Sequence, residues 1–174
     1  MSGWKIKGRP PEGIAKCIVV MAPHTSNWDF VIGRLVFIVY GISPKVLIKK
    51  EIFKPVLGSM LKWLGGIPVD RGRSSNLVGN MAELFEKSES LYLVITPEGT
   101  RKYSPNWKKG FYYIALEANV PIILGYIDYK FREGGIAEVF YPSGDFDKDL
   151  EEIQTFYRTI HAKYPEKFSL SAHD

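Results

Sequence analysis

Short apolar runs of strand length alternate with longer segments of helical period along most of the chain, and this alternation constrains the fold more than any other feature. Apolar runs between turn residues predict buried strands, whereas apolar residues three and four positions apart predict helices. Parallel strands need long crossover connections, which are usually helices, so alternating elements are typical of α/β domains. The sequence therefore predicts a single α/β domain over residues 1–174, with a mixed, mainly parallel sheet flanked by helices.

The predicted elements follow one another in a regular order. We expect strands at residues 17–22, 45–50, 67–69, 91–96, 121–126 and 137–141. We expect helices at residues 27–40, 52–64, 76–87 and 107–118, and a last helix from Asp145 or Asp147 to Tyr164. Gly134-Gly135 favours a hairpin turn before the last strand.

The composition is that of a folded protein, with 45% apolar and 24% charged residues. The only cysteine, Cys17, lies in a strand-like run and is expected to be a small buried hydrophobe rather than a nucleophile. Residues 1–16 lack the apolar core of a signal peptide, and no run reaches the roughly 18 apolar residues of a transmembrane helix. We therefore expect a cytoplasmic protein.

The net charge of +4 is distributed unevenly. Residues 41–63 contain five lysines against one acid, Glu51, and residues 100–111 contain four bases and no acid. The segment 144–174 is acidic, with seven acids and four bases. Such asymmetry indicates an anionic partner on one face, which could be nucleic acid, phospholipid headgroups or a phosphorylated small substrate. Charge alone does not choose among them.

A histidine and an acid five residues apart lie at the first predicted junction between a strand and a helix. His24 follows the strand, and Asp29 falls in the first turn of the helix. Such junctions are where α/β folds build active sites. An imidazole suits proton transfer near neutrality, and a carboxylate can orient the ring and stabilise the imidazolium. Ser26 with Asp29 also fits a capping box, which by itself would explain the acid.

A second stretch, residues 65–71, combines two glycines with a short strand that ends in Asp70 and Arg71. The glycines permit a close approach of the backbone, and a guanidinium at the strand end could bind a phosphate through two parallel hydrogen bonds. In the alternative interpretation the glycines merely end a helix, and Asp70 and Arg71 form a surface pair.

Two more stretches follow the strand predicted at residues 91–96. In the first, Glu98 and Arg101 flank a Gly-Thr turn, which could bind a polar substrate or simply brace the loop. In the second, Lys108 and Lys109 open a helix. A helix start favours anions, so these lysines suggest an anion site more than a solvated face.

Four blocks, taken together and in order, resemble the glycerolipid acyltransferases of the lysophosphatidic acid acyltransferase type. The H-x4-D block of that family is matched by His24 and Asp29, and its G-x-I-x-V-x-R block by residues 65–71. Its P-E-G-T-R block is matched by residues 97–101 and its V-P-I block by residues 120–122. The resemblance covers roughly residues 20–126. Blocks that occur together in this order are far more specific than any one of them.

The resemblance implies an acyltransferase in which His24 takes the proton from an acceptor hydroxyl while Asp29 orients the ring. It implies a phosphate-holding role for two arginines and a pocket-shaping role for their neighbours. The substrate-binding residues implied in this way are Arg71, Glu98, Gly99, Thr100 and Arg101. Pro23 and Thr96 depart from residues common at their positions in the family, which leaves the acceptor lipid open.

The implied donor is an acyl thioester, either acyl-CoA or acyl-carrier protein, and the implied acceptor is a lysophospholipid such as 1-acylglycerol-3-phosphate. No cofactor, metal or nucleic acid is expected as a partner. Because the substrates would be held in a bilayer, we expect peripheral binding to the inner face of the membrane through residues 45–64, where apolar residues alternate with lysines. The alternative for this stretch is a helix packed on the sheet with lysines at its rim.

Two other functions stay open. The chain could be a non-catalytic peripheral lipid-binding protein with the family fold, although binding alone would not require the pair of His24 and Asp29. It could also be a hydrolase in which His24 activates water, although the nucleophile-elbow pattern G-x-S-x-G is absent from the sequence. His161 and His173 have no comparable acid nearby in the sequence and are expected to be surface residues.

Overall fold

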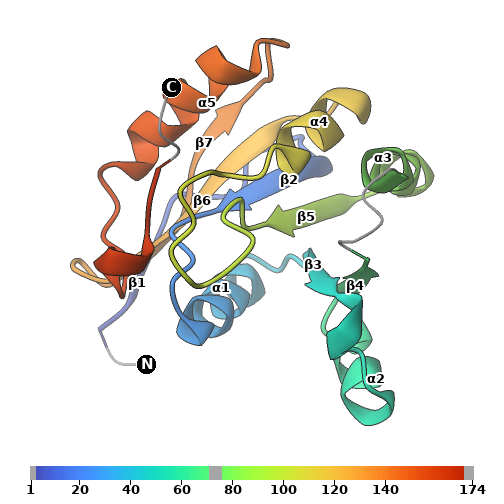
Figure 1. The fold of residues 1–174 in the computed structure, drawn as a ribbon, viewed down its shortest axis with the longest axis horizontal. Helices are drawn as coiled ribbons and strands as arrows, with labels where there is room; N and C mark the ends of the chain where they lie inside the picture. The colour runs from blue at the N-terminus through green and yellow to red at the C-terminus, as the bar shows by residue number, and fades with distance from the viewer. Residues whose placement is uncertain (1–2, 71–75, 171–174) are drawn as a thin grey trace.

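The computed structural model describes residues 3–70 and 76–170, and it shows one seven-stranded sheet between layers of helices (Figure 1). The strand order is β1-β7-β6-β2-β5-β3-β4. Only β6 and β7 pair antiparallel, and every other neighbouring pair is parallel. The strands are β1 (Lys5–Lys7), β2 (Lys16–Met21), β3 (Lys45–Lys49), β4 (Gly66–Val69), β5 (Leu91–Ile95), β6 (Ile122–Asp128) and β7 (Glu133–Phe140). The predicted mixed, mainly parallel α/β fold is confirmed.

The helices divide between the two faces of the sheet (Figure 1). The α-helices are α1 (Asn27–Val39), α2 (Pro55–Trp63), α3 (Leu77–Lys87), α4 (Gly110–Glu117) and α5 (Phe146–Tyr157), with short 3-10 turns at Lys50–Ile52 and Pro165–Lys167. Helix α1 covers one face, and α3, α4 and α5 cover the other. Helix α2 covers neither face and projects beyond the edge formed by β3 and β4.

Strand β2 is central and buried on both sides, as expected of a parallel strand covered by two helical layers. Cys17, Val19 and Met21 pack towards α1, whereas Ile18 and Val20 pack towards the helices of the other layer. Cys17 is fully buried, which confirms its predicted place in the core, and burial raises the pKa of its thiol to about 12.

The register of the central strands brings the loops that follow them to one edge. Val20 of β2 lies opposite Ile95, the last residue of β5, and opposite Leu124 of β6. His24 follows Val20 by four residues, and Glu98 follows Ile95 by three. Since the carboxyl ends of parallel strands meet at the same edge, the loops after β2, β5 and β6 converge there.

The hairpin differs from the prediction. Its turn lies between β6 and β7, at residues 129–132, and Gly134-Gly135 lies inside β7. A Cβ on Gly135 would lie 1.8 Å from the carbonyl oxygen of Lys7, so the glycine permits the close approach of β1 rather than a turn. Strand β1 was not predicted, because its three residues are exposed and show no apolar run.

Three helix boundaries also differ. Helix α5 begins after Asp145, as predicted, but ends at Tyr157, where Thr159 and Ile160 donate to the carbonyls three residues earlier and tighten the chain. Helix α4 begins only at Gly110. Helix α2 begins at Pro55, the favoured first position for proline, after a 3-10 turn.

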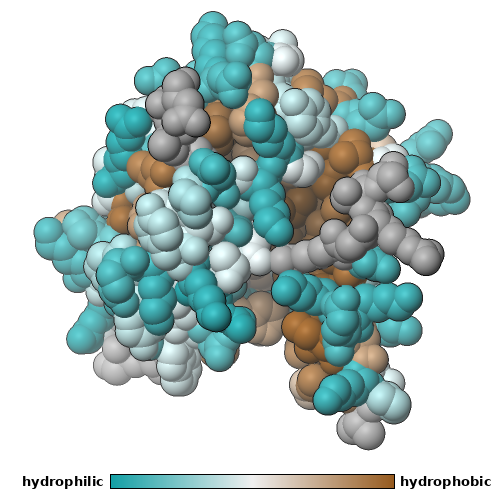
Figure 2. All heavy atoms as spheres, viewed as in Figure 1, coloured by the Kyte–Doolittle hydropathy of each residue, from teal (hydrophilic) through white to brown (hydrophobic). Residues whose placement is uncertain are grey.

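Helix α2 carries basic and apolar side chains on the same exposed surface (Figure 2). Leu57, Met60 and Trp63 are all exposed, and Trp63 is 84% exposed. Helix α2 thus contacts β4 at the edge of the sheet but leaves these three side chains open, so the choice between the two interpretations of this stretch stays a prediction.

Candidate functional site

His24 and Asp29 face each other where β2 ends and α1 begins. The Nδ1 atom of His24 lies 3.4 Å from Oδ2 of Asp29, and the two side chains are 16% and 1% exposed. The same Oδ2 accepts hydrogen bonds from the backbone amides of Thr25 and Ser26, each at 2.8 Å. Ser26 and Asp29 form the predicted capping box. The capping box is therefore confirmed, and the same carboxylate also holds the imidazole, while the catalytic role of the pair stays a prediction.

Tyr129 completes the surroundings of Asp29. Its hydroxyl donates a hydrogen bond of 2.6 Å to Oδ1, the carboxylate oxygen that does not face His24. Burial alone would raise the pKa of Asp29, but hydrogen bonds from His24, Tyr129 and the Ser26 amide lower it below its ordinary value. Burial and the adjacent Asp29 raise the pKa of Tyr129, so its hydroxyl stays protonated and keeps donating.

Sequence reasoning missed Tyr129 because nothing near it in the chain marks it. The residue directly follows β6, the strand that pairs with β2 on one side. Only the strand order indicates that Tyr129 belongs to the site. It brings the end of β6 beside the end of β2, although Tyr129 and Asp29 are 100 residues apart in the sequence.

Glu98 lies against the backbone of His24 and is almost completely buried, with 3% of its surface exposed. Its Oε1 atom accepts a hydrogen bond of 2.9 Å from the backbone amide of His24, so the loop after β5 holds the loop after β2. Among the residues that the structure describes, Oε2 has no hydrogen-bond partner. Burial raises the pKa of Glu98 to about 7. The structure thus connects Glu98 to His24 directly, which the sequence did not predict.

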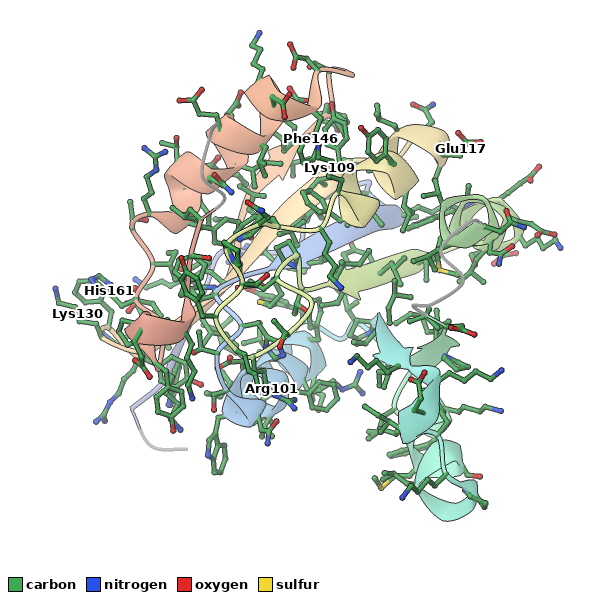
Figure 3. All side chains as sticks on the ribbon, viewed as in Figure 1. Arg101, Lys109, Glu117, Lys130, Phe146 and His161 are labelled. Atoms are coloured by element: carbon green, nitrogen blue, oxygen red, sulfur yellow. The ribbon has the colours of Figure 1, made fainter. Side chains whose placement is uncertain are left out.

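Three other predicted substrate-binding residues, Gly99, Thr100 and Arg101, lie in the same loop after β5 as Glu98. Gly99 has a φ of +65°, and a Cβ there would lie 2.8 Å from Cε of Lys108, so glycine suits both the conformation and the space. The Thr100 hydroxyl accepts from the amide of Lys102 at 3.2 Å. Arg101 is exposed on the same loop (Figure 3). The structure brings Glu98 to His24, whereas Thr100 is engaged within the loop itself.

Arg71, predicted to hold a phosphate, falls outside the described residues, and its role stays a prediction. Arg71 follows β4 in the sequence, and in the sheet β5 and β3 lie between β4 and β2, the strand that precedes His24. Lys109, the residue before α4, places its ammonium 4.4 Å from the ring centroid of Phe146 on α5 (Figure 3). The predicted anion site at this helix start likewise stays untested.

A second pair of histidine and aspartate lies at the end of β6, against expectation. The His161 side chain is 42% exposed, as expected of a surface residue, but its Nδ1 lies 2.9 Å from Oδ2 of the buried Asp128, a partner that its neighbours in the sequence do not indicate. Oδ1 of Asp128 accepts the amides of Lys130 and Phe131, and the amide of Tyr129 donates to the carbonyl of His161. This pair fixes the hairpin turn that carries Tyr129. His173 lies outside the described residues.

Chemically, the site offers a partly exposed imidazole held on one side by an ionised, fully buried carboxylate. Because Nδ1 faces Asp29, the Nε2 atom is left to accept a proton from a bound group. Within residues 3–70 and 76–170, no three side chains of the metal-binding types gather closely enough to hold a metal ion. Over the same ranges, no helix has both the length and the apolar character needed to cross a bilayer.

Comparison with known proteins places this chain in a family. A family model described as Acyltransferase matches residues 9–128. The chain is 28% identical to a 1-acyl-sn-glycerol-3-phosphate acyltransferase of Cocos nucifera, over 74% of this chain and 48% of that protein. It is 30% identical to the human 1-acyl-sn-glycerol-3-phosphate acyltransferase beta, over 70% of this chain and 45% of that protein.

An uncharacterized acyltransferase of Schizosaccharomyces pombe is 31% identical, over 62% of this chain and 40% of that protein. The chain therefore spans less than half the length of these curated relatives. The crystal structure of the 1-acyl-sn-glycerophosphate acyltransferase PlsC from Thermotoga maritima superposes with a TM-score of 0.59 at 17% identity, over 91% of this chain and 73% of that chain. This similarity shows a shared fold.

Proposed function

We propose a reaction and a substrate pair for this chain, which belongs to the acyltransferase family. It transfers a fatty acyl group from an acyl thioester to a hydroxyl of a lysophospholipid such as 1-acylglycerol-3-phosphate. The observation that carries the proposal is the pair of His24 and Asp29, with its atoms 3.4 Å apart and its carboxylate held by two amides and Tyr129. Binding of a lipid would not need an imidazole oriented in this way.

In the proposed reaction, Nε2 of His24 takes the proton of the acceptor hydroxyl as its oxygen attacks the thioester carbonyl. The new ester bond forms, the carbon–sulfur bond breaks, and the leaving thiolate takes up the proton that the imidazolium of His24 holds, which returns His24 to its neutral form. Asp29 stabilises the transient imidazolium, because its carboxylate is already ionised and desolvated. A thiol is a good leaving group, so the reaction needs no covalent acyl-enzyme, and Ser26 acts as a helix cap.

Glu98 has a positioning role in this proposal. It holds the backbone of His24 from the loop after β5, so the imidazole keeps its place while substrates bind. Gly99, Thr100 and Arg101 form the adjoining wall, where an exposed guanidinium suits the phosphate of the acceptor. Arg71 is proposed as a second phosphate ligand on the grounds of its motif.

The substrates are amphiphiles, so we also propose that the protein binds the surface of an anionic membrane through residues 45–64. Support comes from the projecting α2, where Leu57, Met60 and Trp63 are exposed beside Lys54 and Lys62. A helix with this combination can place apolar side chains at the headgroup boundary while its lysines meet anionic lipid.

The test of the reaction is an assay of the purified protein with labelled acyl-CoA, labelled acyl-carrier protein and a panel of lysolipids, with products identified by mass. His24→Ala should lower acyl transfer by at least about 100-fold, because general base catalysis is typically worth 10² to 10⁴. Near-ultraviolet circular dichroism controls for folding. A folded His24→Ala protein that keeps most of its activity would show the assignment to be wrong.

The second candidate is a lipid-binding protein without catalysis. Lysolipid binding without any product from either donor would favour it. Loss of the thioester without acylated acceptor would instead indicate hydrolysis.

A further inference from the structure

A hollow of about 400 Å³ is lined by residues of α1 and of the turn after β6. Tyr129 connects it to Asp29, because this residue lines the hollow while its hydroxyl bonds to Oδ1 of Asp29. The volume lies within the range of about 300 to 1,000 Å³ that is usual for small-molecule sites. The described residues that line it are Trp4, Trp28, Ile32, Tyr129, Arg132 and Lys163.

The lining favours an anion. It contains two bases, Arg132 and Lys163, and none of the lining residues is an acid. The ammonium of Lys163 lies 5.5 Å from the ring centroid of Trp28 and 5.7 Å from that of Tyr129. These rings hold the ammonium in place through cation–π interactions without neutralising its charge. The same two bases would repel a quaternary ammonium group, so a choline headgroup does not fit.

The lining also favours a flat ring. Three of its six members are aromatic, and Ile32 is its one aliphatic side chain. Trp4 meets Tyr129 edge to face, with centroids 5.3 Å apart, so these two rings form a fixed corner. Trp28 is 54% exposed and leaves much of its indole open to a ligand. Exposed aromatic side chains stack on nucleobases, whereas an acyl chain packs best against aliphatic side chains.

We propose that this hollow binds the adenine and phosphate groups of a coenzyme A thioester. The inference rests on the proposed function, in which both substrates carry phosphate but only coenzyme A adds an aromatic base. Lys163 and Arg132 would meet the phosphates and Trp28 the base. The flexible arm of the coenzyme would then lead past Tyr129 towards His24.

The test measures binding without turnover. We would titrate the full chain with 3′,5′-ADP by isothermal calorimetry, and in parallel with monomeric lysophosphatidate and with inorganic phosphate. The variants are Trp28→Leu and Lys163→Ala. The matched controls are Trp63→Leu, on the projecting α2, and Lys167→Ala, whose ammonium lies 4.2 Å from the Tyr164 ring centroid but does not line the hollow. Circular dichroism verifies the fold of each variant.

We expect 3′,5′-ADP to bind the parent protein. Trp28→Leu should raise its Kd by about 5- to 100-fold, the range of stacking on a single base. Lys163→Ala should raise it by about tenfold or more, since a charge-assisted phosphate contact is lost. Both controls should stay within about twofold of the parent.

Three results would overturn the inference. The first is that 3′,5′-ADP does not bind the parent protein. The second is that Trp28→Leu and Lys163→Ala bind 3′,5′-ADP as tightly as the parent and the controls do. The third is that these two variants weaken the binding of lysophosphatidate but not that of 3′,5′-ADP, which would make the hollow a lipid-headgroup site. Acyl transfer from acyl-carrier protein without 3′,5′-ADP binding would remove this inference and leave the proposed function intact. Transfer that persists in His24→Ala alongside normal 3′,5′-ADP binding would contradict the proposed function and leave the binding site intact.

Discussion

Among single residues, Asp29 has the most partners at the site. Oδ2 receives the amides of Thr25 and Ser26 and faces His24, while Oδ1 receives the hydroxyl of Tyr129. Any substitution of Asp29 therefore disturbs the start of α1 and the orientation of the imidazole together. Tyr129 offers a cleaner probe, because its hydroxyl bonds only to Oδ1, away from the oxygen that receives the amides of the helix start.

Tyr129→Phe should lower kcat by about 3- to 30-fold and leave KM for both substrates nearly unchanged. The loss of one hydrogen bond to a buried carboxylate weakens the support of the imidazolium, and a hydrogen bond to a charged group is worth roughly 1.5–3 kcal/mol. The retained ring keeps the packing with Trp4. Steady-state kinetics on both substrates measure the split, with Tyr164→Phe as the control. A rise in KM with unchanged kcat would mean that the hydroxyl binds substrate instead.

Glu98 predicts a pH dependence of stability. Burial raises its pKa to about 7 in the folded protein, from an ordinary value of 4.5. The folded state therefore holds a proton that the unfolded state releases, and stability falls as pH rises between these two values. The loss is on the order of 3 kcal/mol at most, since each pKa unit corresponds to about 1.4 kcal/mol.

Glu98→Gln keeps the oxygen that accepts from the His24 amide but cannot ionise. Urea unfolding at pH 5 and pH 8 should show the parent losing stability relative to the variant at the higher pH. Equal pH dependence of the two proteins would mean that Glu98 titrates normally.

Among the elements, β1 depends on a glycine in its neighbour. A Cβ on Gly135 would lie 1.8 Å from the carbonyl oxygen of Lys7 and 2.9 Å from the hydroxyl of Tyr40, whereas one on Gly134 would meet nothing closer than 3.4 Å. Gly135→Ala should therefore force β1 away from β7 and lower the free energy of unfolding by about 1–3 kcal/mol.

Hydrogen exchange of the β1 amides and urea unfolding measure this effect, with Gly134→Ala as the matched control. Gly135→Ala should speed exchange in Lys5–Lys7, and Gly134→Ala should not. Equal exchange in the two variants would contradict the role assigned to Gly135.

For the whole molecule, the sequence predicted what depends on local periodicity. Apolar runs located β2, β5 and β6, and the capping box located the start of α1. The sequence could not predict β1, because a three-residue exposed strand carries no apolar signal. It also missed Tyr129 and the partner of His161, since both depend on strand order rather than on neighbours in the chain.

The projection of α2 from the domain predicts how the molecule would meet a membrane. Lys49, Lys50 and Lys54 are exposed at the base of the projection, and Met60 and Trp63 are exposed along it. Each lysine near an anionic surface contributes roughly 1 kcal/mol, screened by salt. Reversing the three lysines to glutamate replaces attraction by repulsion, so it should abolish sedimentation with anionic vesicles at low salt.

The control for this experiment must carry the same change of charge elsewhere. Reversal of Lys5, Lys130 and Lys148 meets that need, because all three are exposed and lie outside residues 45–64. It should weaken sedimentation only modestly, through the net charge alone. If the two triple variants sediment alike, the attraction arises from the overall charge of the protein, and residues 45–64 are not its membrane-binding surface. If only the reversal within residues 45–64 abolishes sedimentation, this segment orients the molecule on the bilayer.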